Sequence, residues 1–102
     1  IYVTGSTNLI VDSSTFTNNK AAQTAGSGYH GGAIYNGSSG ILNISSGTSF
    51  LENSATTSGG AIYNAGTTNV GSSVNFSNNN SGFNGKIFLE IKIEEFFSYT
   101  FI

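Results

Sequence analysis

The chain has 102 residues, of which 37% are hydrophobic, only 8% are charged and 14 are glycine. It contains no Cys, which excludes a disulfide framework and thiolate metal sites. The formal net charge is −2, and without a basic surface to follow a phosphate backbone the composition argues against nucleic acid as a partner. No apolar run approaches the ~20 residues of a transmembrane helix, so no membrane span is expected in this piece.

The chain begins at Ile1 and lacks the basic start and apolar core of a signal peptide. We therefore expect either that a targeting segment has been left out or that this is an internal piece of a longer protein. Ile1 and Tyr2 match the tail of a motif that is complete further along. Phe16 to Asn19 is the first copy of a second motif, FxxN, and an aliphatic residue, Ile10, lies six positions before its Phe.

The segment from Lys20 to His30 is a longer connection than its counterpart in the next copy. The Asn of FxxN and the second Gly of the following motif are 13 residues apart here, but only 7 residues apart one copy later. Extra residues in a repeat protein form loops, and loops often bind. Lys20, Tyr29 and His30 are therefore the candidate contact residues, and the alternative is a solvent loop without a binding role.

The two motifs alternate along the rest of the chain with nearly constant spacing. GGAIYN occupies residues 31–36 and returns 28 residues later at residues 59–64. FxxN returns at residues 50–53 and 76–79, with Ile44 and Val70 six positions before the Phe. The residues that carry the repeat are Phe16, Asn19, Gly31, Gly32, Ile34, Phe50, Asn53, Gly59, Gly60, Ile62, Phe76 and Asn79.

The residue types within each repeat predict short strands. β-branched and aromatic residues lie in short stretches bounded by Gly, Ser and Asn, and no 3.6-residue apolar stripe indicates a helix. A period of about 30 residues with several strands is typical of a solenoid. We therefore predict an all-β fold, a single-stranded, right-handed parallel β-helix with about three to four coils, in which each residue lies above its counterpart one coil below.

This stacking gives each repeated residue type a role. The Phe of FxxN and the Ile of GGAIYN should form two inward stacks. The Asn of FxxN should form a ladder at a turn, because its side chain both donates and accepts hydrogen bonds and tolerates the left-handed conformation of tight turns. The paired glycines should supply the same conformational freedom at another corner.

The end of the chain departs from the repeat composition. Residues 85–88 match a decayed copy of GGAI, so we assign residues 1–88 to the repeats and residues 89–102 to a divergent tail. Apolar and charged or aromatic residues alternate over residues 87–94, which predicts one amphipathic strand. Either this tail caps the solenoid or it is a chain end unrelated to the repeat.

The alternation of GGA[ILV] with FxxN resembles the repeats of the chlamydial polymorphic outer-membrane proteins. The resemblance covers about residues 1–88. It implies a protein similar to autotransporters, with a long β-helical passenger on the cell surface, and a role in adhesion to host cells and antigenic display. The implied location is extracellular, on the cell surface or outer membrane, and the implied partners are the host-cell surface, the extracellular matrix and neighbouring coils of a longer parent chain.

β-Helices also include polysaccharide lyases and hydrolases, which need clustered carboxylates, often with calcium. Before residue 85 the only acidic residues are Asp12 and Glu52, and they occupy different places in their repeats. We therefore predict no catalytic site, no metal, no cofactor and no enzymatic activity. The leading hypothesis is a surface adhesin or structural passenger, the alternative is a non-catalytic fragment of a carbohydrate-active β-helix enzyme, and an ice-binding Thr face ranks below both.

Overall fold

The computed structural model describes residues 1–22, 29–82, 88–90, 93–96 and 99–101. All the secondary-structure elements assigned in these residues are β-strands. The first coil contains β1 (Tyr2–Val3), β2 (Asn8–Val11), β3 (Thr15–Thr17) and β4 (Lys20–Ala21). The second coil contains β5 (Ile34–Asn36), β6 (Ile41–Ile44), β7 (Ser49–Leu51) and β8 (Ser54–Ala55). The third coil contains β9 (Ile62–Asn64), β10 (Thr67–Val70), β11 (Val74–Ser77) and β12 (Asn80–Ser81), and β13 (Phe88–Glu90), β14 (Ile93–Phe96) and β15 (Tyr99–Phe101) follow.

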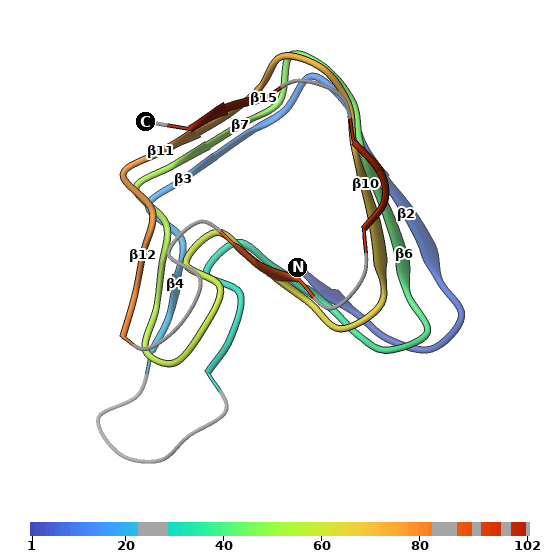
Figure 1. Cartoon of the computed structure of the whole chain (residues 1–102). Coiled ribbons are helices and arrows are strands. Elements are labelled where there is room, and N and C mark those ends of the chain that lie inside the picture. The colour runs from blue at the N-terminus through green and yellow to red at the C-terminus, as the bar shows by residue number, and fades with distance from the viewer. Residues whose placement is uncertain (23–28, 83–87, 91–92, 97–98, 102) are drawn as a thin grey trace.

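The described strands form four parallel sheets, because each strand pairs with the strand at the same place in the next coil. Sheet A contains β1, β5, β9 and β13, sheet B contains β2, β6, β10 and β14, sheet C contains β3, β7, β11 and β15, and sheet D contains β4, β8 and β12. Viewed along the stack in Figure 1, sheets A, B and C surround a triangular interior, and sheet D lies on an arm at the lower left. The chain runs counter-clockwise as it approaches the viewer, which is the right-handed sense usual for parallel strand connections. The predicted parallel β-helix is confirmed.

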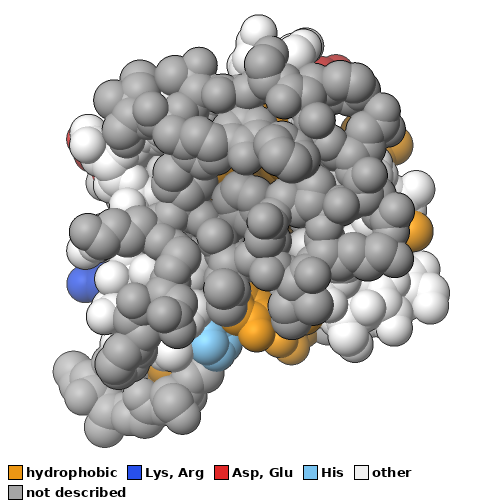
Figure 2. Space-filling model, viewed as in Figure 1, with side chains coloured by type: hydrophobic (Ala, Val, Ile, Leu, Met, Phe, Trp, Pro, Cys, Tyr) orange, Lys and Arg blue, Asp and Glu red, His pale blue; other side chains and the backbone are white. Residues whose placement is uncertain are grey.

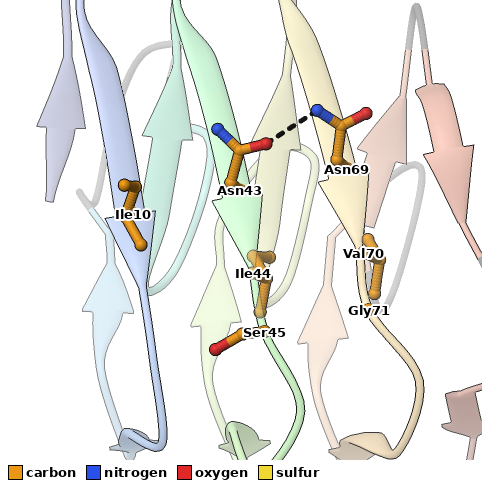
Figure 3. A pocket seen from close by; sticks show the side chains of 7 residues that line it. All are labelled: Ile10, Asn43, Ile44, Ser45, Asn69, Val70 and Gly71. Atoms are coloured by element: carbon orange, nitrogen blue, oxygen red, sulfur yellow. Dashed lines mark hydrogen bonds between the residues drawn. The ribbon is translucent and has the colours of Figure 1, made fainter.

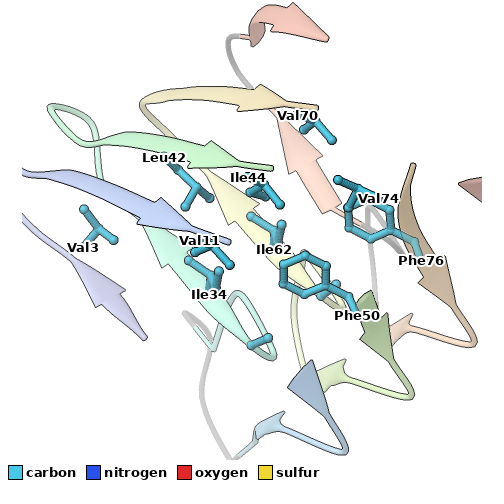
Figure 4. Packing of buried hydrophobic residues seen from close by; sticks show 12 residues of the cluster. Val3, Val11, Ile34, Leu42, Ile44, Phe50, Ile62, Val70, Val74 and Phe76 are labelled. Atoms are coloured by element: carbon cyan, nitrogen blue, oxygen red, sulfur yellow. The ribbon is translucent and has the colours of Figure 1, made fainter. Parts of the chain in front are cut away.

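The interior contains the two predicted apolar stacks (Figure 4). Phe50 pairs with Phe16 on one side and with Phe76 on the other, and the stacked rings have centroid distances of 4.9 and 5.1 Å. We call these three residues the phenylalanine stack. Ile34 and Ile62 are likewise in register, and both are fully buried. Apolar burial in equivalent positions therefore holds successive coils together.

Asparagines form a ladder between the coils, as predicted, in which Asn53 and Asn79 are buried and Asn19 is exposed. The side-chain amide of Asn19 donates to the side-chain oxygen of Asn53, and that of Asn53 donates to Asn79, both at 3.0 Å. These three residues form the asparagine ladder. The structure adds a second buried pair that the sequence analysis missed, in which Asn36 donates to Asn64 at 2.8 Å. The buried amides of Asn36 and Asn53 thus donate to a partner in the neighbouring coil, which offsets part of their desolvation, while the side-chain oxygen of Asn36 has no partner among the described residues.

The left-handed turn residue of FxxN is not the ladder asparagine. The residue before it has the positive φ in every copy, at 58° in Asn18, 55° in Glu52 and 55° in Asn78. The prediction that the ladder residue serves the turn through its backbone is therefore wrong. The ladder side chain must point inward, and the sharp turn occurs one residue earlier.

The two glycines of GGAIYN are required for different structural reasons. The first glycine has a positive φ, 70° in Gly31 and 69° in Gly59, so it supplies the predicted conformational freedom. Gly32 has no such φ. A Cβ there would meet the carbonyl oxygen of Gly60 and the backbone of Ser54, which belong to the next coil. The second glycine is therefore required by close packing between coils.

The predicted equivalence of Ile10 with the later core residues is wrong. Ile10 pairs with Asn43 and is 69% exposed, whereas Val11 pairs with Ile44 and is buried. The first coil has one residue fewer between this core position and Phe16 than the later coils have before their Phe. Since neighbouring residues of a strand face opposite sides, a one-residue difference turns Ile10 outward.

The described part of the tail does not form one strand over residues 87–94. Phe88 pairs with Ile62, as expected for a fourth GGAI copy, so β13 extends sheet A. β14 begins at Ile93 and extends sheet B by pairing with β10. β13 and β14 are separate strands because they pair with β9 and β10, which belong to different sheets. Residues 85–87 and 91–92 lie outside the described residues.

Candidate functional site

A row of tyrosines marks the outer surface of sheet A. Strand alternation buries Ile34 and Asn36 and leaves Tyr35 between them half-buried on the outer face. The Tyr35 ring stacks on Tyr2 at 4.7 Å with an interplanar angle of 5°, and on Tyr63 at 5.0 Å with an angle of 11°. We call Tyr2, Tyr35 and Tyr63 the tyrosine row. Parallel strands place one such ring in each coil, so the row follows the axis of the solenoid.

The long connection of the first coil brings two more rings to this row. The backbone of Tyr29 accepts a hydrogen bond from the backbone nitrogen of Thr57 at 3.1 Å. His30 pairs with Ser58 in an isolated parallel bridge. The His30 ring centroid lies 4.4 Å from that of Tyr63 and 6.4 Å from that of Tyr35. The end of the connection is therefore held against the next coil by backbone and ring contacts.

These rings surround a cavity of about 470 Å³ between the arm and the outer face of sheet A. Its lining residues, called the aromatic groove below, are Tyr2, Ala21, Tyr29, His30 and Tyr35. Figure 2 shows the histidine beside a patch of hydrophobic side chains at this edge of the molecule. Four aromatic side chains from two consecutive coils thus converge on one opening, and this arrangement is the candidate site.

Two of the three residues that the sequence analysis proposed for contact lie in this groove. Tyr29 and His30 line it, whereas Lys20 is exposed on β4 and is not among the lining residues. Tyr2 and Tyr35 were missed. A signal for them existed, because the Tyr of IYN lies between two core positions and strand alternation turns such a residue outward.

Two polar groups of the groove, the Tyr35 hydroxyl and the His30 imidazole, are partly shielded from solvent. Loss of solvent contact, followed by the nearby Tyr2 and Tyr63 hydroxyls, raises the pKa of Tyr35 above its ordinary value, so its hydroxyl stays protonated at neutral pH. The Nδ1 atom of His30 is shielded from solvent and has no hydrogen-bond partner among the described residues. The groove therefore offers a hydroxyl and an imidazole nitrogen within a largely aromatic wall.

A smaller cavity of about 240 Å³ lies on the outer face of sheet B (Figure 3). The exposed Ile10 lines it together with Asn43 and Asn69, whose amides are joined by a 2.8 Å hydrogen bond. Asn43 in turn donates to Asn8 at 2.8 Å. Both groups of the Asn43 amide are therefore bonded along the sheet, and the side-chain oxygen of Asn69 has no partner among the described residues. The residues on this face are therefore explained by hydrogen bonds between coils and by the outward-facing Ile10, without a binding role.

Asp12 and Glu52 do not form a catalytic pair. Asp12 follows β2, where hydrogen bonds from Ser45 and Ser13 hold its pKa below the ordinary value of 3.8. Glu52 follows β7, at a different corner of the coil. Among the described residues, no three His, Cys, Asp or Glu gather into a group that could hold a metal ion.

Within the described part of the chain, no helix has the length and hydropathy needed to cross a membrane. The repeat of the Chlamydia polymorphic membrane proteins matches the sequence at residues 13–37 and 47–65. These two ranges contain the first two FxxN copies and both GGAIYN copies, which form strands β3, β5, β7 and β9. No curated protein and no solved structure matches the chain significantly. Two segments of the chain therefore match the repeat of the Chlamydia polymorphic membrane proteins, and they lie in consecutive coils of a right-handed parallel β-helix.

Proposed function

We propose that the chain is part of a cell-surface β-helical passenger that binds host cells or extracellular matrix through the aromatic groove, without catalysis. The observation that supports this most is the convergence of Tyr29 and His30, from the long connection, on the tyrosine row. Aromatic residues dominate binding energy at protein surfaces, and exposed apolar patches mark interaction sites. The rest of the fold repeats, but this connection is longer than its counterpart in the next coil.

The surface location is supported by the family of the repeat, whose members are membrane proteins of Chlamydia. A non-catalytic role is supported by the separation of Asp12 and Glu52, which lie at different corners. An enzyme of the carbohydrate-active β-helix class would need its carboxylates in coils beyond those described here. No observation favours that alternative.

The test is attachment of the purified chain to cultured epithelial cells and to extracellular matrix, measured with fluorescent chain. A double variant, Tyr29→Ala with His30→Ala, should attach about tenfold more weakly, because two aromatic contacts are lost. Both residues belong to the long connection and not to the core, so circular dichroism should show an unchanged fold.

Ile10→Ala is the matched control for this experiment. It removes the most exposed large apolar side chain, 69% exposed, from a different face of the molecule. Attachment should be unchanged if contact is made through the groove. Equal losses for both variants would indicate non-specific hydrophobic adsorption, and unchanged attachment of the double variant would remove the groove from the proposed function.

A further inference from the structure

The charge of the groove restricts its ligand to a neutral one. None of the five lining residues carries a carboxylate, an ammonium or a guanidinium group. A charged ligand group would lose hydration in this cavity without gaining a partner of opposite charge, which is strongly unfavourable. Lys20 precedes the lining residue Ala21 in the sequence. It is exposed and is not among the lining residues.

The ring geometry of Tyr35 argues against a cationic contact at this residue. Tyr35 is covered on one face by Tyr2 and on the other by Tyr63, so it offers the groove its edge and its hydroxyl. Aromatic edges carry partial positive charge, whereas quaternary ammonium ligands need uncovered ring faces. A ligand rich in oxygen atoms suits the edge of Tyr35.

Backbone geometry argues against an added peptide strand. Strand addition requires unpaired backbone groups at a sheet edge. Here the backbone nitrogen of Tyr35 already donates to Ile1 at 2.8 Å, and the backbone oxygen of Tyr29 accepts from Thr57 at 3.1 Å. Recognition through Tyr29 and Tyr35 must therefore rely on side chains, whereas Tyr2 lies in β1, the edge strand of sheet A.

The available side chains combine apolar surface with a few neutral hydrogen-bonding groups. The Tyr35 hydroxyl can donate and accept, and the imidazole ring of His30 lines the groove, although its Nδ1 atom is shielded from solvent. Binding sites of this size, a few hundred Å³, usually have such a wall with a small number of placed polar groups. A sugar ring has the complementary surface, because it carries apolar C–H faces and several neutral hydroxyls.

We propose that the aromatic groove binds a neutral saccharide chain, with the Tyr35 hydroxyl and His30 as its polar contacts. This inference rests on the proposed contact function and names the chemistry of the partner. The saccharide lies along the outer face of sheet A, and its apolar ring faces contact the aromatic side chains of the groove.

The experiment is saturation-transfer NMR of the 102-residue chain with neutral oligomers of glucose, galactose and N-acetylglucosamine, and with heparin as the charged comparison. At least one neutral oligomer should bind. Tyr35→Phe keeps the stacked ring and removes only the hydroxyl, so affinity for that oligomer should fall about three- to tenfold.

Tyr63→Phe is the matched control, because Tyr63 belongs to the same row but is not a lining residue of the groove. It should leave saccharide affinity unchanged, and His30→Ala should weaken it as Tyr35→Phe does. The inference would be overturned if only heparin bound and if Lys20→Ala weakened that binding. It would also be overturned if none of the neutral oligomers bound.

Failure of this inference can be separated from failure of the proposed function. Host cells treated with glycosidases that remove neutral glycans should lose most attachment of the chain. If attachment persists on treated cells and still depends on Tyr29 and His30, the contact function stands and the saccharide inference is wrong. The partner is then a protein ligand, such as a peptide that the groove recognises through side chains.

Discussion

Replacing Phe50 with Ala is expected to lower the free energy of unfolding by about 3–5 kcal/mol. Phe50 is fully buried and its ring stacks between Phe16 and Phe76. Truncation removes the contacts on both ring faces and leaves a cavity that hydrogen-bonded coils close only in part. Because small domains are stabilised by only about 5–15 kcal/mol, urea unfolding followed by circular dichroism should show a large shift or an unfolded chain.

Phe16→Ala provides the comparison for this result. Phe16 is half-buried and stacks on a single ring, that of Phe50. Its truncation should therefore cost clearly less than that of Phe50. A Phe50→Ala variant that unfolds together with the wild-type chain would show that the phenylalanine stack has a different register.

Asn53→Ala is expected to cost about 2–4 kcal/mol, although Asn53 is polar. Its amide donates to the carbonyl oxygen of Phe16 at 2.9 Å and to the side chain of Asn79 at 3.0 Å. Its side-chain oxygen accepts from both the backbone and the amide of Asn19, at 2.9 and 3.0 Å. Removing this side chain takes away the donor to the carbonyl oxygen of Phe16 and the acceptor for Asn19, and leaves the side-chain oxygen of Asn79 only the backbone nitrogen of residue 53 as a donor. Urea unfolding measures the loss.

Asn43→Ala is the matched control, because Asn43 lies in the same coil and also bonds to both neighbouring coils. It donates to Asn8 and accepts from Asn69, each at 2.8 Å, on the outer face of sheet B. Water can replace these bonds, so the cost should stay below about 1 kcal/mol. Equal costs for Asn53→Ala and Asn43→Ala would contradict a stabilising role for the interior asparagine ladder.

The core was predictable wherever the repeat spacing is regular. Phe16, Phe50 and Phe76 recur with the same motif, so their stacking follows from the period alone. Ile10 could not be placed correctly, because the corner between β2 and Phe16 is one residue shorter than in the later coils. This difference turns Ile10 to the opposite face of the strand and leaves the FxxN motif intact. The buried pair formed by Asn36 was missed because Asn is a polar residue type that is mostly exposed in proteins.

The candidate site was predictable only in part, because it joins two coils. The length of the first connection identified Tyr29 and His30, but it gave no reason to leave out Lys20. The other wall is made by Tyr2, which is distant from the connection in sequence, and by Tyr35, which follows the connection closely. These two residues come side by side only through the register of the stack. Such convergence depends on three-dimensional geometry, which a motif does not contain.

The in-register parallel stack is tested most directly by disulfide cross-linking, since the chain has no native Cys. Ser49 and Asn75 are Cα partners in β7 and β11, and adjacent strands lie about 4.8 Å apart, within the range that a disulfide spans. The double variant Ser49→Cys with Asn75→Cys should oxidise to an intramolecular disulfide, detected by mass spectrometry of the monomer.

The control pairs Ser49→Cys with Ser77→Cys, which lies two residues further along β11. Diagonal Cα atoms in a sheet are about 7–8 Å apart, too far for a disulfide without backbone movement. The parallel β-helix predicts rapid cross-linking of the first pair and little of the second. Failure of the first pair to form a bridge, or preferential bridging of the second, would contradict the coil register.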